Sequence, residues 1–197
     1  MCWGTKSNLP DQPQNLFELD SGSSVARNFA KYSHGSVVIA NLMDTRWLTI
    51  ASPTTEAVVN PLIAACDEGV VPDEIRLLSN PGLADTVSML RPLLADIVAE
   101  YDGEPTVTVH SLDAETQYGE IVSFFVDGIK DALDNSASVA VDFTPGRKFM
   151  SAIAFQAGLQ YGADHVFYLH LQSTDYGYSY PDIPRTNAEL VDFTEVV

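Results

Sequence analysis

Two cations follow a Pro-Gly turn between an apolar run and an alanine-rich stretch. The segment Val139–Ala152 has the sequence VAVDFTPGRKFMSA, so Arg147 and Lys148 stand where a predicted strand gives way to a predicted helix. Backbone N–H groups at a helix start have no intrahelical partner, and the helix dipole adds positive charge there. Because the chain holds only ten Lys and Arg against 27 Asp and Glu, the segment predicts an anion site suited to phosphate.

Three polar loops are candidates for this site, since ligands of open α/β sheets bind beyond the carboxyl ends of the strands. Residues 52–55, 79–82 and 144–148 each follow a predicted strand. Hydroxyl and N–H groups of the first and last loop can hold phosphate, with Lys148 as a point charge and Arg147 as a planar fork. Asp142 and Thr144 also fit a turn and a helix cap. Cations at a helix N-terminus are unfavourable because they oppose the helix dipole. Their presence at this turn therefore favours a bound anion.

Other common chemical motifs are missing from the sequence. It contains no G-x-x-x-x-G-K-[ST] phosphate loop, no G-x-G-x-x-G fingerprint and no G-x-S-x-G nucleophile turn. The four histidines, His34, His110, His165 and His170, lack metal-ligand spacing, and the last three are predicted core or edge residues of strands. No cofactor and no metal site are therefore expected.

The elements that must position these loops alternate along the chain. Apolar runs predict strands and amphipathic patterns predict helices, and several strands are apolar on both faces. The predicted strands are 46–51, 74–78, 106–112, 138–143 and 165–171, and the predicted helices end at Asp67 or span 83–101, 116–133 and 148–161. This alternation of strands and helices predicts an α/β fold with a doubly wound, mostly parallel sheet and helices on both faces.

The two ends of the chain differ from this pattern. Residues 1–34 are polar and broken by Gly and Pro, which predicts an irregular arm with one short helix near residues 24–32. Residues 35–197 form the predicted domain, which begins with a strand at 36–42. Its last part, residues 173–197, is rich in Pro and Tyr and is predicted to be a loop or hairpin folded against the domain. Its tyrosines could stack on bases, although packing against the sheet is the favoured interpretation.

Composition narrows the function classes. The chain has 197 residues, 46% of them hydrophobic, and a net charge of −17. Dispersed acidic residues favour adaptation to a salt-rich cytoplasm over a surface that mimics nucleic acid, and they argue against a binder of long duplex DNA. No apolar run reaches the roughly 18–20 residues that span a bilayer, so no membrane contact is expected. Two cysteines make no disulfide framework, which favours a cytoplasmic location.

In three stretches of sequence, the chain resembles the CARF domain, the CRISPR-associated Rossmann fold that senses cyclic oligoadenylates. The stretch from Asp142 to Ser151 is similar to the family's D-x-T-G-G-T-K-x-M-[ST] motif, with Thr144, Gly146 and Lys148 in register. Residues 69–79 are similar to its second-strand motif, and residues 165–184 to its ending. Two departures are Pro145 for the first Gly and Arg147 for the second Thr.

The resemblance implies a Rossmann-like, standalone module that forms a homodimer around a cyclic oligoadenylate ring. It implies that phosphate contacts come from the three loops, and that Lys148 and Ser52 would serve cleavage of the ring through attack by a ribose 2′-OH, as in ring nucleases. A sensor or adaptor without catalysis, and an unrelated nucleotide-binding α/β domain, are the alternatives. The expected ligand-binding residues are Thr54, Thr55, Ser79, Asn80, Thr144, Pro145, Gly146, Arg147 and Lys148.

Overall fold

A computed structural model of the chain describes residues 32–33, 36–37, 44–172 and 177–197. The chain divides into two compact units, residues 1–42 and 43–197. In the first unit, β1 (Tyr32–Ser33) pairs antiparallel with β2 (Ser36–Val37). The predicted helix near residues 24–32, apart from Tyr32, and the predicted strand beyond Val37 lie outside the described residues.

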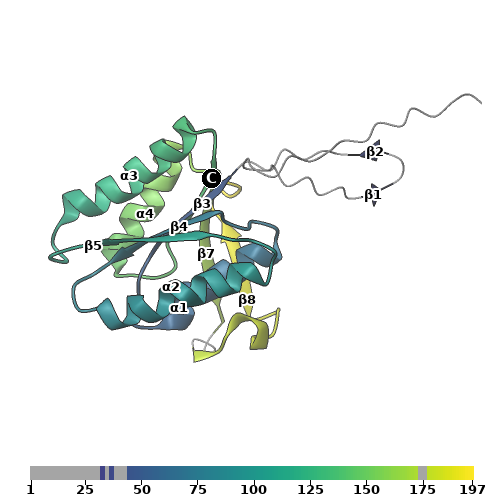
Figure 1. The fold of residues 1–197 in the computed structure, drawn as a ribbon, viewed down its shortest axis with the longest axis horizontal. Coiled ribbons are helices and arrows are strands. Elements are labelled where there is room, and N and C mark those ends of the chain that lie inside the picture. The colour runs from purple at the N-terminus through teal and green to yellow at the C-terminus, as the bar shows by residue number, and fades with distance from the viewer. Residues whose placement is uncertain (1–31, 34–35, 38–43, 173–176) are drawn as a thin grey trace, which may run out of the picture. The chain divides into compact units, whose positions relative to one another are not determined.

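The second unit is one mixed sheet covered by helices (Figure 1). The strands lie in the order β5-β4-β3-β6-β7-β8, and all neighbours pair in parallel except β7 and β8. This arrangement confirms the predicted Rossmann-like, doubly wound α/β fold. The strands are β3 (Thr45–Ile50), β4 (Glu74–Ser79), β5 (Thr106–Ser111), β6 (Ser138–Asp142), β7 (His165–Leu171) and β8 (Ala188–Asp192). The helices are α1 (Thr55–Asp67), α2 (Ala84–Ala99), α3 (Tyr118–Asp134), α4 (Lys148–Tyr161) and the short 3₁₀ helix η2 (Tyr180–Asp182).

The central strands are apolar on both faces because helices cover both faces. In β3, Leu48 and Ile50 belong to the core cluster shared with α3 and α4. Trp47, which precedes Leu48 and points to the opposite face, belongs to the cluster shared with α1 and α2 and stacks on Phe167 with ring centroids 5.8 Å apart. Figure 1 shows the two helix pairs on opposite sides of the sheet. Among the helices of the described part, none is long and apolar enough to cross a membrane.

Within the predicted C-terminal segment, strand β8 pairs antiparallel with β7, a strand that precedes the segment. Asn60 of α1 is 1% exposed and holds the connection between these strands. Its Nδ2 donates to the Tyr178 carbonyl and its Oδ1 accepts the Tyr180 N–H, both at 2.9 Å. Tyr180 is buried, in line with the favoured packing interpretation, whereas Tyr178 is 59% exposed.

Candidate functional site

The order in which the chain adds strands to the sheet reverses between β3 and β6, which pair in parallel although they are far apart in sequence. From β3 the chain continues to β4 on one side, and from β6 it continues to β7 on the other. The loops that leave Ile50 and Asp142 therefore diverge and open a crevice at the carboxyl edge of the sheet. Both loops contain predicted ligand-binding residues, so the topology brings the first and third polar loops together.

Asp142 fixes the turn at the end of β6. It is fully buried; its Oδ1 accepts the Thr144 N–H at 2.9 Å, and its Oδ2 accepts the Thr49 hydroxyl at 2.8 Å. The Thr144 hydroxyl in turn accepts the Leu169 N–H at 2.9 Å, which ties the turn to β7. Asp142 and Thr144 thus brace the turn, as the turn interpretation of these residues predicts.

Burial changes the acidity of this carboxyl. Loss of solvation raises the pKa of Asp142 to about 7, although hydrogen bonds from Thr144 and Thr49 favour the charged form.

The Pro-Gly pair shapes the turn around Ile50. Gly146 has φ +96°, and a Cβ placed there would lie 3.0 Å from two side-chain carbons of Ile50. Glycine is therefore the residue that fits. Pro145 is buried, and its carbonyl accepts the Ser151 hydroxyl at 3.1 Å. Both positions hold the start of α4 in place.

The N-terminus of α4 differs from those of the other three α-helices. The first turns of α1, α2 and α3 carry Glu56, Asp85 and Glu120, which complement the helix dipole. The first turn of α4 carries no acidic residue and has Lys148 instead; like the other three helices, α4 has no side-chain cap. Its leading N–H groups thus remain open to an anion.

The two cations have different surroundings. Arg147 Nη2 lies 2.7 Å from Glu115 Oε1, so this ion pair accounts for one cation at the helix start without a ligand. Glu115 comes from the β5–α3 connection and was not predicted, although it follows the carboxyl end of a predicted strand, as the other loops do. Lys148 is exposed and makes no hydrogen bond or ion pair within the described part of the chain. Lys148, more than Arg147, is therefore free to meet an anion.

A pocket of about 430 Å³ occupies the crevice. It brings together four of the predicted residues, Ser52, Asn80, Gly146 and Arg147, with Glu115 at its wall. The Ser52 hydroxyl accepts the Thr54 N–H at 3.2 Å, and Thr54 is the N-cap residue of α1. The other predicted residues do not line this pocket; they are Thr54, Thr55, Ser79, Thr144, Pro145 and Lys148.

Asn80 has an unpaired polar atom. The side chain is 9% exposed, its Nδ2 has only the weak acceptor Met150 Sδ at 3.5 Å, and its Oδ1 has no partner in the described structure. Buried amide oxygens are normally hydrogen-bonded, since leaving one unpaired costs about 1–3 kcal/mol. The sequence places Asn80 after a strand but does not reveal this burial.

The histidines of the described strands take structural positions. His165 Nδ1 lies 2.7 Å from Asp192 Oδ2, which joins β7 to β8, and exposed His110 lies 3.6 Å from Glu120. Among the residues that the structure describes, no three His, Cys, Asp or Glu side chains gather in a way that would hold a metal ion. The buried thiol of Cys66 has its pKa raised to about 12, chiefly by loss of solvation, so it stays protonated.

Comparisons with known proteins show a structural similarity. No family model and no curated protein match the chain. A solved structure that is similar is that of a type III CRISPR defence DNA nuclease activated by cyclic oligoadenylate. The TM-score is 0.50 at 17% sequence identity, and the match covers 66% of this chain but 19% of the nuclease. The match thus spans about one fifth of the nuclease, and it shows a shared fold.

Proposed function

We propose that this protein binds a cyclic oligoadenylate at the crevice between β3 and β6. The observation that carries the proposal is the acid-free start of α4, with Lys148 in its first turn, beside the pocket that holds Ser52 and Asn80. A helix N-terminus with a cation suits a phosphodiester. The resemblance of residues 142–151 to the CARF motif and the fold shared with part of the nuclease support the choice of ligand.

In this proposal, the ring's phosphates lie against the first turn of α4. Lys148 and the leading N–H groups supply the positive charge, and Ser52, Thr54 and Thr55 supply hydroxyl groups from the facing loop. Arg147 joins them when the ligand competes with Glu115 for its guanidinium. Thr144 and Pro145 serve the site by holding the turn, and Ser79 by its place in the strand that leads to Asn80.

The proposed binding unit is a homodimer, because a ring with even internal symmetry fits a twofold site. Helix α4 supports this part of the proposal. It carries no acidic residue in a chain with 27, and its exposed positions Ala152, Gln156 and Gln160 are four residues apart. An uncharged stripe that continues from Lys148 would let two acidic copies approach without repulsion. A Gln156→Glu variant is expected to shift the protein toward monomer in sedimentation runs at molar salt; an unchanged dimer would argue against this face.

Cleavage of the ring is the finer part of the proposal. Lys148 would stabilise charge that develops on the phosphorus, and Ser52 would orient the attacking 2′-OH, so that positioning does most of the work. One observation favours a sensor without catalysis. The two carboxyls near the pocket are already occupied: Glu115 is paired with Arg147, and Asp142 accepts hydrogen bonds from Thr49 and Thr144.

Calorimetry with cyclic tetra-adenylate and hexa-adenylate in molar salt tests the binding. Lys148→Ala is expected to weaken binding about tenfold to a hundredfold, because a charge-assisted hydrogen bond is lost. Lys130→Ala is the matched control, since Lys130 lies over the Tyr161 ring at the other end of α4. Unchanged affinity in Lys148→Ala would refute the site. Chromatography of the incubated rings then separates a ring nuclease, which releases a 2′,3′-cyclic phosphate, from a sensor, which leaves the ring intact.

A further inference from the structure

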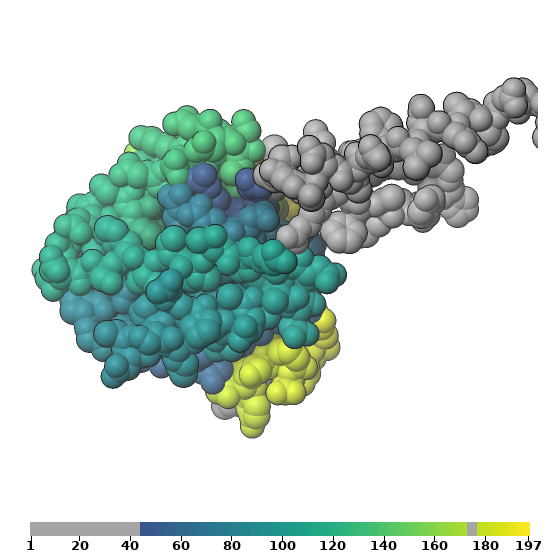
Figure 2. Space-filling model, viewed as in Figure 1, coloured from purple at the N-terminus to yellow at the C-terminus, as the bar shows by residue number. Residues whose placement is uncertain are grey.

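A second cavity adjoins the pocket in the crevice between β3 and β6, the switch-point pocket. It is a groove of about 820 Å³ lined by residues of α2 and β5. Both elements belong to the teal surface that is turned toward the viewer in Figure 2. Asn80 and Pro81 line both cavities, so the groove begins where the switch-point pocket ends. A ligand anchored at the start of α4 can therefore extend into the groove.

The chemistry of the groove suits an uncharged aromatic ring that belongs to an anion. Val87, Val107 and Val109 provide apolar walls, and the charged side chain that lines the groove is Arg91. No Asp or Glu lines it, whereas the switch-point pocket includes Glu115 and the cavity on the other side of β5 includes three acidic residues. In a chain with 27 acidic residues, an acid-free groove with one arginine is suited to a base attached to a phosphate.

Asn80 stands at the junction with one hydrogen-bonding group unused. In the described structure, only two buried side-chain polar atoms lack a partner, Asn80 Oδ1 and Trp47 Nε1. Trp47 is enclosed in the core, whereas Asn80 lines both cavities. The amide is held only by Met150 Sδ, a weak acceptor, so a rotation about χ2 that turns Oδ1 toward the groove breaks no strong hydrogen bond.

We infer that the groove receives a purine base of the bound nucleotide and that Asn80 recognises the exocyclic amino group of adenine. This inference builds on the proposed function. The adenine amino group donates to Asn80 Oδ1, and the base lies between the apolar walls. Asn80 Nδ2 donates to adenine N7 at the same time. In hypoxanthine a carbonyl oxygen replaces the amino group, and an amide turned to donate Nδ2 to that oxygen would place Oδ1 against N7, so neither orientation satisfies both positions. A site with a buried polar group rejects such an analogue strongly.

Calorimetry with cyclic tetra-adenylate and its inosine counterpart tests the inference. The wild type is expected to bind the adenylate ring at least about tenfold more tightly, since one hydrogen bond distinguishes the rings. Asn80→Ala should reduce this preference to within about twofold, and Asn135→Ala, an exposed amide at the end of α3, should leave it unchanged. A preference that survives in Asn80→Ala overturns the inference.

A second variant tests the groove itself. Ser88 is an exposed residue of α2 that lines the groove, so Ser88→Trp fills the groove without disturbing the core. We expect the affinity for the adenylate ring to fall about tenfold while the circular dichroism spectrum stays unchanged. Wild-type affinity in this variant would place the base elsewhere.

A binding experiment with mononucleotides tests this inference separately from the proposed function. If neither ring binds to the wild type, the proposed function fails, and 5′-AMP is compared with 5′-IMP. A tenfold preference for AMP that Asn80→Ala removes would uphold base recognition by Asn80. Equal affinity for the two mononucleotides would overturn it.

Discussion

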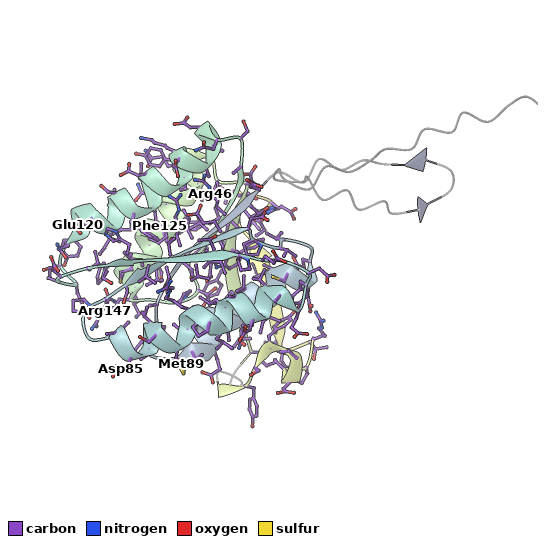
Figure 3. All side chains as sticks on the ribbon, viewed as in Figure 1. Arg46, Asp85, Met89, Glu120, Phe125 and Arg147 are labelled. Carbon is purple, nitrogen blue, oxygen red and sulfur yellow. The ribbon has the colours of Figure 1, made fainter. Side chains whose placement is uncertain are left out.

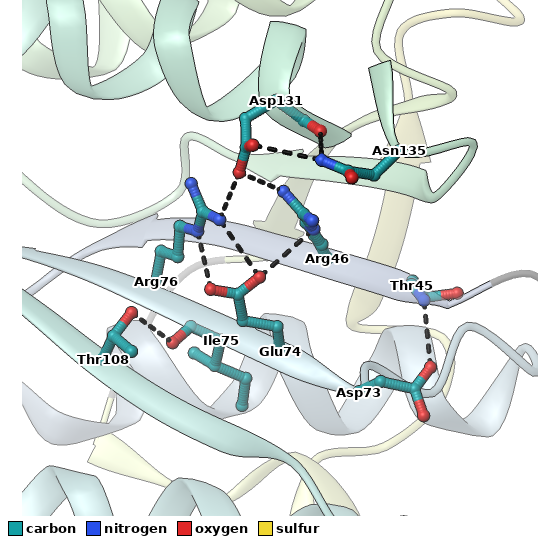
Figure 4. A network of polar contacts seen from close by, with 9 residues as sticks. All are labelled: Thr45, Arg46, Asp73, Glu74, Ile75, Arg76, Thr108, Asp131 and Asn135. Carbon is teal, nitrogen blue, oxygen red and sulfur yellow. Dashed lines mark hydrogen bonds and ion pairs between the residues drawn. The ribbon is translucent and has the colours of Figure 1, made fainter. Parts of the chain in front are cut away.

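Polar groups are paired at the amino-end edge of the central strands and partly unpaired at the carboxyl-end edge. At the amino ends, Arg46, Arg76, Glu74 and Asp131 form a closed network of ion pairs (Figure 4). At the carboxyl ends, Asn80 Oδ1 and the Lys148 ammonium have no partner among the described residues. Figure 3 shows the separation, with Arg46 at one edge and Arg147 at the other. Paired charges at one end join strands to a helix, and unpaired groups at the other end are available for a ligand.

The network at the amino ends joins both strands to α3. Glu74 lies 3.2 Å from Arg46 Nε and 2.7 Å from Arg76 Nε. Asp131 of α3 pairs with Arg76 Nη2 at 2.6 Å and also with Arg46. Hydrogen bonds from these two arginines hold the pKa of Asp131 below its usual value. Every charge has an opposite partner, so nothing in the network calls for a ligand.

The largest expected effect concerns the pH dependence that Asp142 gives to the carboxyl end. Burial raises its pKa to about 7, so between about pH 4 and pH 7 the folded state holds a proton that the unfolded state has released. The contribution of Asp142 to the free energy of unfolding is fully present below about pH 4. It is lost as the pH rises through 7, by up to about 1.4 kcal/mol per pH unit. Urea unfolding from pH 4 to 8 should show the wild type losing stability relative to Asp142→Asn. Parallel curves would mean that Asp142 titrates normally.

A smaller effect is expected when the network at the amino ends is broken. Arg46→Ala removes one of the two arginine partners of Glu74 and Asp131 and should lower the free energy of unfolding by about 2 kcal/mol, because the Arg46 side chain is only 15% exposed. Affinity for the ring should not change. Lys148→Ala should show the reverse pattern, with lost affinity and unchanged stability. If both variants lose stability alike, the contrast between the two ends fails.

Much of this contrast follows from local sequence, and part of it does not. The bounds of α4 and β7 agree with the prediction because the Pro-Gly turn begins the helix and Gly162, at φ 78°, ends it. The strand–loop rule also identified Ser52, Asn80 and Gly146. The pairing of Arg147 with Glu115, the burial of Asn80 and the four-residue network depend on how distant elements pack. Such contacts are not encoded within one segment of sequence.

The third prediction concerns Gly146, whose conformation shapes the site. Gly146→Ala adds a Cβ at φ +96°, close to Ile50, and should cost about 1–2 kcal/mol of stability. Gly69→Ala is the matched control, because Gly69 has φ +95° but nothing within 4 Å of the added Cβ. Comparing thermal unfolding of the two variants separates backbone strain from the contact with Ile50. If both variants lose the same stability, backbone strain accounts for the whole effect of Gly146→Ala and the contact with Ile50 for none of it.

The smallest expected effect concerns Glu115, the carboxylate that faces the site. Its ion pair with Arg147 is largely exposed, with the two side chains 38% and 60% accessible, and exposed pairs contribute at most about 1 kcal/mol. Glu115→Gln therefore leaves stability nearly unchanged, removes a negative charge from the pocket wall and frees the guanidinium for phosphate. We expect ring affinity to rise about twofold to fivefold at low salt, and less in molar salt, where screening weakens the repulsion. A fall in affinity would instead mean that Glu115 orients Arg147 for the ligand, and the carboxyl end would then share the paired organisation of the amino end.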